Sequence, residues 1–432
     1  YNSHNVVVEP TFFSEMLGLQ GRMDMLQTDF RVLVEQKAGK ASYASARSNA
    51  DTPYYRDQHY MQMLLYMAII RYNYRSCYED NNHELHAFLL YSKYKRPLVG
   101  LGFAPGLPYK ALRLRNLYVV QEDALCRGGL EALMEQTPDD FNEKQARGIL
   151  WERYQRPRIE KVLTSFRSAS ELERRYFARF YRFVALEHRM SKVGGMSKEC
   201  SGFASAWLSS LEEKLQCGNI IINMTMQPCP KDDSVKLDSV RFLFDGDAGN
   251  FRDGDIVVLH SYTIGHAPDL RRTIVHRAII SKIEPDVLTL RLRNPQHDAS
   301  VFVNKPDVRW CIEHDFMESS YNGLYKGLYS LLSATRERKD LVLMQRRPKV
   351  VKSAKLLGDY GRFNILQQRV KDAKELFLII GPPGTGKTSF GLLNTLQEEL
   401  LERDSRVLLV AYTNRAVDEI CSKLTGIVDF VR

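Results

Sequence analysis

The sequence GPPGTGKT, from Gly381 to Thr388, decides the fold of the C-terminal part of the chain. It matches the phosphate-binding pattern G-x-x-x-x-G-K-[ST]. The apolar run Leu376–Ile380 precedes the loop and predicts a buried strand, and the residues from Ser389 onward predict a helix. This order of strand, glycine loop and helix is the context that the pattern requires, and it predicts an α/β nucleotide-binding domain.

The residue types in the loop suit a nucleoside triphosphate. Glycines let backbone N–H groups converge on phosphate oxygens, and the helix that follows adds a favourable dipole. We expect Lys387 to reach the β- and γ-phosphates and Thr388 to hold Mg²⁺. The residues predicted to bind ATP in the loop are Gly381, Gly384, Thr385, Gly386, Lys387 and Thr388.

A second acidic motif is needed for nucleotide hydrolysis, and no suitable one follows the loop. Asp418 and Glu419 come well after the apolar run Val407–Val410, in a stretch that predicts a helix. We therefore expect an internal piece of a longer protein, which by itself binds nucleotide weakly and hydrolyses almost none.

Composition narrows the class of protein. A chain of 432 residues suggests two to four domains. No run of 18 apolar residues is present, which predicts no membrane partner. The net charge of +9 favours an anionic partner such as nucleic acid. Seven cysteines without a C-x-x-C pair indicate reduced thiols in a cytoplasmic protein, or a nuclear one if the source has a nucleus.

Five regions follow one another along the chain. Residues 1–150 mix strands and helices, 151–234 are helical and basic, 306–350 form a helical connector and 351–432 begin the nucleotide-binding domain. Residues 235–305 predict a small β-barrel, whose expected strands are Asp255–His260, Thr273–Ile283, Val287–Arg293 and Val301–Val303.

The helical region contains a helix with a clear start. Ser170 and Glu173 match a capping box, and Gly194-Gly195 supplies a stop. An apolar stripe at helical spacing follows the start: Leu172, Tyr176, Phe180, Phe183 and Leu186 or Glu187. Arginines between these residues allow contact with nucleic acid, but we favour an amphipathic connecting helix whose aromatic stripe is packed.

Acidic residues and a lysine gather near the N-terminus. The segments Gly21–Leu26 and Val32–Lys37 each predict a strand, so Glu35 and Lys37 share one face and an antiparallel partner brings Asp24 beside them. Two carboxylates and a lysine suit metal-assisted phosphodiester cleavage. The alternative is a solvated cross-strand ion pair.

The next segment favours the catalytic interpretation. Its pattern H-x-x-Q-x-x-x-Y begins at His59, in an apolar helical stretch, and places Gln62 and Tyr66 on one helix face.

The order G-x-x-D, E-x-K and Q-x-x-x-Y resembles the RecB-like branch of the PD-(D/E)xK nucleases, within the nuclease–helicases that process Okazaki flaps and resect DNA ends. The resemblance implies that Asp24 and Glu35 bind Mg²⁺ or Mn²⁺, with the Gln36 carbonyl as a possible further ligand. It makes Lys37 the catalytic lysine, and Gln62 and Tyr66 supporting residues. The four-cysteine spacing of the family's iron–sulfur cluster is absent, so that cofactor is not expected. The part of the nuclease domain with the family's histidine ligand is expected to be missing from the chain.

The C-terminal part resembles superfamily 1 helicases. Gly361–Gln367 is similar to their adenine-reading element, with Gln367 as the reader and Gln368 as the alternative. Val407–Asp418 is similar to their first strand-binding motif, which implies that Thr413 and Asn414 contact nucleic acid. The implied fold is an α/β multidomain protein with a PD-(D/E)xK nuclease core, a helical stalk, a small β-barrel and a truncated RecA-like domain.

The leading hypothesis is an ATP-dependent helicase and nuclease that acts on single-stranded or flapped DNA. The alternatives are a nucleic-acid remodeller with a non-catalytic nuclease-like scaffold and an RNA helicase with an accessory domain. Fold resemblance does not separate DNA from RNA.

Overall fold

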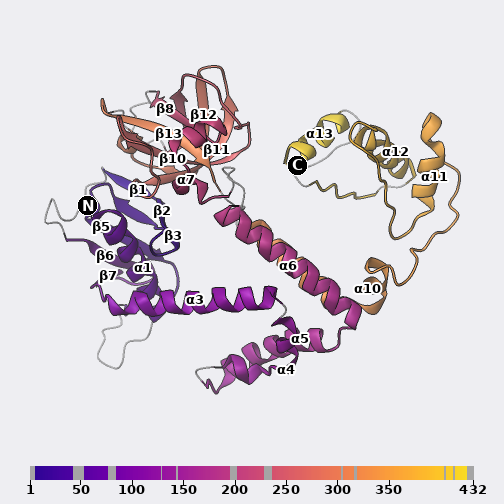
Figure 1. Cartoon of the computed structure of the whole chain (residues 1–432), viewed down its shortest axis with the longest axis horizontal. Coiled ribbons are helices and arrows are strands. Elements are labelled where there is room, and N and C mark those ends of the chain that lie inside the picture. The colour runs from indigo at the N-terminus through magenta and orange to yellow at the C-terminus, as the bar shows by residue number, and fades with distance from the viewer. Residues whose placement is uncertain are drawn as a thin grey trace. The chain divides into compact units, whose positions relative to one another are not determined.

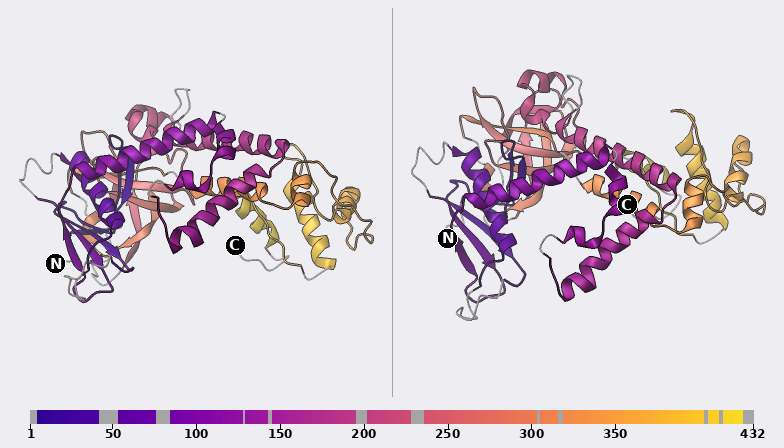
Figure 2. Two further views of the ribbon diagram at one scale, coloured as in Figure 1. Left: turned by 90° about the horizontal axis from the view of Figure 1, so that it is seen from below. Right: turned by 60° about the horizontal axis from the view of Figure 1, so that its bottom comes forward.

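The structure is a computed structural model, which describes residues 5–41, 53–75, 84–127, 129–142, 145–194, 202–227, 236–302, 305–315, 319–402, 405–411 and 414–425. The chain forms two compact units (Figures 1 and 2). The first unit comprises residues 1–168 and 175–328, and the second comprises 169–174 and 329–432. None of the helices in the described ranges has the length and apolar content needed to cross a membrane.

A five-stranded sheet forms the core of the N-terminal region. Its order is β1 (Val6–Val8), β4 (Met25–Gln27), β5 (Val32–Lys37), β6 (His86–Tyr91) and β7 (Leu98–Leu101). The central strand β5 pairs antiparallel with β4 and parallel with β6. The described helices that lie with this sheet include α1 (Asp57–Asn73) and the long α3 (Gly106–Cys126). The buried side chains of α1 pack with those of the sheet in one apolar cluster that fixes the helix against the strands.

The second sheet closes into a barrel. Its strands are β8 (Ile220–Met226), β9 (Leu237–Leu243), β10 (Ile256–Thr263), β11 (Val275–Ile283), β12 (Val287–Gln296) and β13 (Val308–His314). The order β10-β13-β8-β9-β12-β11 returns to its start because β10 also pairs with β11, and the interior is an apolar cluster. The strand-rich region extends beyond the predicted limits of 235–305, since β8 precedes them and β13 follows them. The expected strand Val301–Val303 is instead a 3₁₀ turn, η4 (Ala299–Phe302), and Val303 lies outside the described residues.

A hairpin joins the barrel to the N-terminal region. β2 (Thr11–Ser14) and β3 (Leu19–Arg22) extend the barrel sheet through the pair Val275↔Thr11. The Gln296 side chain adds reciprocal hydrogen bonds, accepting from the Val8 amide at 2.9 Å and donating to its carbonyl at 2.8 Å. The N-terminal sheet and the barrel therefore belong to one continuous body.

The helical region runs through η1 (Gly129–Glu131), α4 (Ala132–Glu135), η2 (Pro138–Phe141), η3 (Trp151–Gln155), α5 (Arg156–Arg167), α6 (Glu171–Val193), α7 (Ser205–Leu208) and α8 (Leu211–Gln216). The capping box of α6 is present: the Ser170 amide donates to Glu173 at 3.1 Å, and the Glu173 amide donates to the Ser170 hydroxyl at 3.3 Å.

The packed face of α6 differs from the predicted one. Phe177 and Val184 are buried, whereas Leu172, Phe180, Phe183 and Leu186 of the predicted stripe are exposed. Two further side chains of the helix, Tyr181 and His188, stack against tyrosines of α9 (Ser319–Leu332). The packed face is rotated by about one residue because α9 covers it, and the spacing of apolar residues alone cannot say which of two adjacent stripes has a partner.

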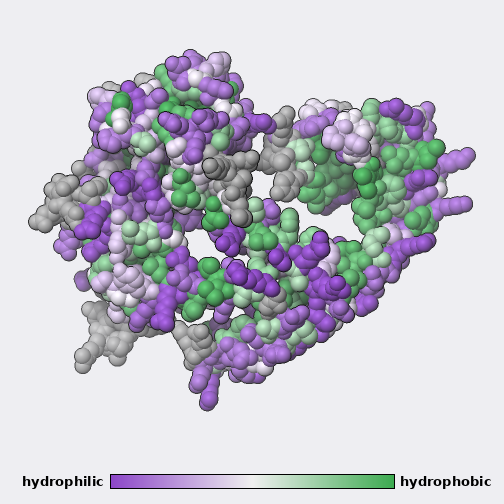
Figure 3. All heavy atoms as spheres, viewed as in Figure 1, coloured by the Kyte–Doolittle hydropathy of each residue, from purple (hydrophilic) through white to green (hydrophobic). Residues whose placement is uncertain are grey.

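The second unit contains α10 (Arg336–Val342), η5 (Gly361–Phe363), α11 (Asn364–Asp372), η6 (Lys387–Leu392), α12 (Leu393–Glu402) and α13 (Asn414–Leu424). The two predicted strands are not formed: 376–380 and 407–410 have no regular secondary structure. Their apolar side chains are largely exposed: Ile380 is 92% and Leu408 is 85% exposed. Figure 3 colours hydrophobic residues green, and several green areas lie on the surface shown. An apolar run becomes a strand only when a neighbouring strand supplies hydrogen bonds, and the described residues of this unit contain no sheet.

Candidate functional site

Five predicted residues of the N-terminal region converge at one end of β5. Glu35 and Lys37 come from the strand itself, and Gln62 and Tyr66 come from α1. The sequence predicts a strand over Gly21–Leu26, which would include Asp24. In the structure Asp24 lies instead in the bend between β3 and β4. That bend still brings Asp24 beside β5, because β4 pairs antiparallel with β5.

Glu35 is the centre of this cluster. Its Oε1 accepts a hydrogen bond from Lys37 Nζ at 2.7 Å and another from Gln62 Nε2 at 2.7 Å. Its Oε2 accepts from the Asp24 amide at 3.3 Å. The carboxylate is buried, so these donors offset the cost of removing its charge from water.

Gln62 uses all parts of its amide. Its oxygen accepts from Lys37 at 2.9 Å, and its nitrogen donates to Glu35 and to the Tyr66 hydroxyl, the latter at 2.8 Å. The Tyr66 hydroxyl in turn donates to the Arg22 carbonyl at 2.7 Å. This pattern fixes the orientation of the Gln62 amide, because the reversed orientation would face Lys37 with a donor.

Backbone geometry positions Asp24 and Tyr66. The amide of Gln36 donates to Asp24 Oδ2 at 2.6 Å. At Gly21 a Cβ atom would lie 3.0 Å from the Tyr66 ring and 3.2 Å from Ile69, so a larger residue would push these side chains of α1 away by a few tenths of an ångström. The glycine of the G-x-x-D pattern therefore has a packing role.

The electrostatics are those of two neighbouring acids in a dry site. Burial raises the pKa of Glu35, the Lys37 hydrogen bond opposes that rise, and repulsion from Asp24 adds to it. Burial also raises the pKa of Tyr66 to about 12, although its hydrogen bond with Gln62 opposes the rise. Tyr66 is thus a neutral donor, and Lys37 supplies one positive charge beside the two carboxylates.

The donor set fits a hard divalent ion, because Mg²⁺ commonly takes one or two carboxylates and completes its shell with water and phosphate oxygens. No group of three or more His, Cys, Asp or Glu side chains that could hold a metal occurs in the described parts of the chain. Asp24 and Glu35 would therefore hold such an ion without a third acidic or histidine ligand from these residues. His4, the nearest histidine upstream, lies outside the described residues.

The phosphate-binding loop has the backbone that its glycines allow. Gly384 and Gly386 have φ of 79° and 80°, in the left-handed region. The helix begins at Lys387 as one π-helical turn, η6, before α12. The Lys387 ammonium donates to the carbonyls of Gly381 at 2.5 Å and Pro382 at 2.8 Å.

Both candidate adenine readers make internal hydrogen bonds. Gln367 is only 1% exposed; its nitrogen donates to the Phe390 carbonyl at 3.1 Å, and its oxygen accepts from Thr395 at 2.9 Å. Gln368 donates to the Ala354 carbonyl and to Asp372. Adenine recognition by either residue would require these bonds to open. Of the residues predicted to contact nucleic acid, Thr413 lies outside the described residues, and Asn414 begins α13 with its side chain undescribed.

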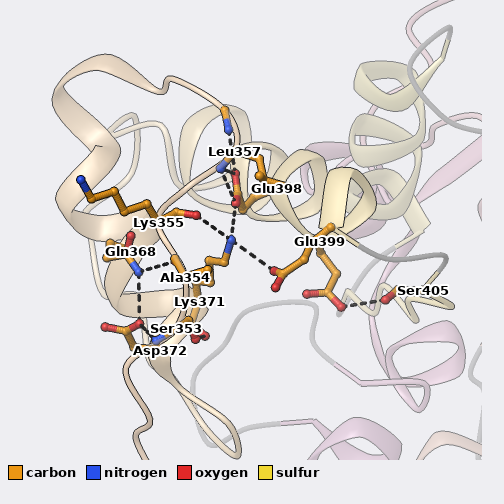
Figure 4. A network of polar contacts seen from close by, with 12 residues as sticks. Ser353, Ala354, Lys355, Leu357, Gln368, Lys371, Asp372, Glu398, Glu399 and Ser405 are labelled. Carbon is orange, nitrogen blue, oxygen red and sulfur yellow. Dashed lines mark hydrogen bonds and ion pairs between the residues drawn. The ribbon is translucent and has the colours of Figure 1, made fainter.

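A buried carboxylate in the second unit escaped sequence analysis. Glu398 of α12 accepts from the Leu357 amide at 2.9 Å and from Lys371 at 2.8 Å (Figure 4). It also accepts from the Gly358 amide at 3.1 Å and from the Tyr360 hydroxyl at 3.0 Å. Burial raises its pKa, but these donors outweigh burial and hold the pKa at about 2. Nothing in an ordinary helical glutamate signals this role, which ties the segment before α11 to α12.

Comparison with known proteins indicates similarity to helicases and helicase/nucleases. A family model described as an AAA domain matches residues 363–430, which include the phosphate-binding loop. The DNA replication ATP-dependent helicase/nuclease JHS1 of Arabidopsis thaliana is 31% identical over 179 residues, 36% of this chain and 13% of the relative. The DNA replication ATP-dependent helicase/nuclease dna2 of Schizosaccharomyces pombe is 29% identical over 132 residues, 29% of this chain and 9% of the relative.

A third relative matches a shorter part of the chain. The DNA polymerase alpha-associated DNA helicase A of Schizosaccharomyces pombe is 41% identical over 80 residues, 17% of this chain and 12% of the relative. The matches therefore span a small part of each relative's length. Together they support a helicase/nuclease family of DNA replication, at modest identity and over part of the chain.

Proposed function

We propose, starting from the similarity to the helicase/nucleases of DNA replication, that this chain carries a metal-dependent DNA nuclease site and the nucleotide-binding loop of a helicase motor. The proposed substrate is single-stranded or flapped DNA. The observation that supports the nuclease is the closed set of hydrogen bonds linking Glu35, Lys37, Gln62 and Tyr66, with Asp24 held beside Glu35.

Asp24 and Glu35 would hold Mg²⁺ or Mn²⁺. Such an ion neutralises charge on a phosphodiester and lowers the pKa of bound water. The chain's own contribution is to hold both carboxylates beside each other, and the amide of Gln36 and the side chains of Lys37 and Gln62 supply the hydrogen bonds for this.

Lys37 is the proposed contact with the reacting phosphate. An ammonium group has three N–H donors. Two of them are used by Glu35 and Gln62, so one is left for water or for a phosphate oxygen. Because the first two bonds fix the direction of the third, Lys37 can stabilise developing negative charge without reorganisation.

Cleavage of labelled substrates tests this function. Single strands, 5′ flaps and matched RNA strands are incubated with Mg²⁺, with Mn²⁺ or with EDTA. We expect metal-dependent cutting of DNA that falls by about 100-fold or more in Lys37→Ala. Lys110→Ala, which removes an exposed lysine on α3, is the control. Unchanged cutting by Lys37→Ala would remove the nuclease assignment, whereas strand binding without cutting would favour a non-catalytic scaffold.

The motor assignment has its own test. The Lys387 ammonium donates hydrogen bonds to two loop carbonyls and can donate instead to phosphate oxygens of ATP. Thr388 would hold the accompanying Mg²⁺. We expect a fluorescent ATP analogue to bind weakly, to be lost in Lys387→Ala and to be hydrolysed very slowly. Equal binding by Lys387→Ala would contradict this role, and brisk hydrolysis would contradict the expectation of an incomplete motor.

A further inference from the structure

The amino end of α1 carries a second set of side chains that the proposed catalytic cluster does not use. His59 lies on the same helix face as Gln62 and Tyr66, because the three residues are spaced at about one helical turn. Immediately before the helix, Tyr54 and Tyr55 stack on each other, and Tyr55 continues the stack onto Tyr60.

The orientation of the His59 ring is fixed by Tyr91. The Tyr91 hydroxyl accepts from the Arg56 amide at 3.2 Å, and we assign its own proton to the bond with His59 Nδ1, 2.8 Å away. Burial raises the pKa of Tyr91, which keeps that proton in place. An Nδ1 that accepts requires the proton of neutral imidazole to be on Nε2. Within the described residues Nε2 makes no hydrogen bond, so His59 presents an unused donor.

The surroundings of His59 are basic. Its pKa is lowered by burial, by Lys37 and by Arg56, which places these cations near the ring and keeps the ring neutral at neutral pH. A neutral donor beside two cations suits an anionic oxygen and does not suit another cation.

The tyrosine stack ends in an exposed ring. Ring centroids are 4.5 Å apart for Tyr54 and Tyr55 and 4.7 Å apart for Tyr55 and Tyr60. The Tyr60 hydroxyl donates to the Gly102 carbonyl at 2.9 Å, which anchors the inner end of the stack. At the outer end Tyr54 is 48% exposed. Anchored aromatic rings beside basic groups form the kind of surface on which bases of single strands stack.

We propose that His59 and Tyr54 form a nucleotide subsite that holds single-stranded DNA next to the catalytic cluster. His59 Nε2 donates to a backbone phosphate beside the scissile one, and a base stacks on the exposed ring of Tyr54. Tyr91, Tyr55 and Tyr60 are positioning residues. The inference rests on the proposed nuclease function, since that function places the strand at Lys37, but strand binding can be measured without cleavage.

Binding of a fluorescent oligothymidylate to the whole chain in EDTA tests the subsite. We expect His59→Ala and Tyr54→Ala each to weaken binding by about tenfold, or about 1.4 kcal/mol. His59→Gln should retain most of the affinity, because the glutamine Nε2 can donate from a similar position. The matched controls are His86→Ala, at the opposite end of the strand pair β5–β6, and Tyr118→Ala, an exposed tyrosine on α3.

An abasic oligonucleotide separates the two contacts. On this strand Tyr54→Ala should bind as well as the unmodified chain does, since there is no base to stack, while the effect of His59→Ala should persist. In Mg²⁺, His59→Ala should raise KM with little change in kcat, as expected of a contact made equally in the ground state and the transition state.

The outcomes distinguish the two proposals. If the chain cuts DNA and both substitutions leave binding and KM unchanged, the subsite is wrong and the nuclease stands. If the chain binds DNA through both residues but never cuts, the subsite stands and the nuclease is wrong. Failure of the unmodified chain to bind either strand overturns the subsite, as does an equal loss of affinity in the two control variants.

Discussion

Replacement of Gln62 by leucine tests the residue that links the strand β5 and the helix α1 in the candidate site. Leucine is of similar size but removes the acceptor for Lys37 and the donors to Glu35 and Tyr66. Two of these bonds involve a charged partner and are each worth about 1.5–3 kcal/mol, and the bond to Tyr66 adds about 1 kcal/mol. The apolar leucine recovers part of this, so we expect a loss of about 2–4 kcal/mol in the free energy of unfolding.

Calorimetry and cleavage assays measure the two consequences of Gln62→Leu. Loss of a side chain that orients metal-binding carboxylates typically reduces activity by about 10–100-fold. The control is Gln58→Leu, one turn earlier on α1 at an exposed position. A Gln62→Leu chain with the unfolding temperature and the cleavage rate of the unmodified chain would refute the hydrogen-bond account of the site.

Three further changes probe other parts of the molecule. Burial lowers the pKa of His276 to about 4, so between pH 6.5 and pH 4 this imidazole is protonated in the unfolded chain but not in the folded one. The free energy of unfolding should therefore drop by about 3 kcal/mol as the pH falls over that range. His276→Phe should remove this loss in urea titrations. Gly21→Ala should press on Tyr66, cost about 1–3 kcal/mol and slow cleavage, whereas Gly100→Ala, with 3.6 Å to its nearest side chain, should do neither in the same assays. Glu398→Gln should speed hydrogen exchange at the two loop amides that this carboxylate binds, and unchanged exchange there would argue against its anchoring role.

The local geometry of the candidate site could be predicted from sequence because it depends on two simple periods. Alternation along β5 places Glu35 and Lys37 on one side, and a helical turn separates Gln62 from Tyr66. The position of Asp24 followed from an antiparallel partner, although the residue lies in a bend. The catalytic roles of these residues stay predictions.

Contacts between distant segments could not be predicted. No local pattern announces that Thr11 pairs with Val275, that Tyr91 orients His59, or that Glu398 accepts the amides before α11. Each of these contacts depends on where whole elements pack, which a window of a few residues does not contain.

The hydrophobic pattern also gave wrong predictions where a neighbouring element determines whether an apolar segment is buried. The runs 376–380 and 407–410 have the composition of buried strands, but they have no hydrogen-bonded neighbour and stay irregular and largely exposed. In α6 the sequence offers two adjacent apolar stripes, and α9 selects the one that contains Phe177 and Val184. Composition indicates what a segment can bury, and the rest of the fold determines whether it does so.

The hairpin β2–β3 has a mechanical consequence. Its second strand leads directly into the bend that carries Asp24, and its first strand is pinned to β11 of the barrel. Force applied to the barrel would therefore reach the carboxylate pair through hydrogen-bonded backbone, without an intervening flexible linker. The separation between the barrel and Asp24 would therefore stay the same when either part is loaded.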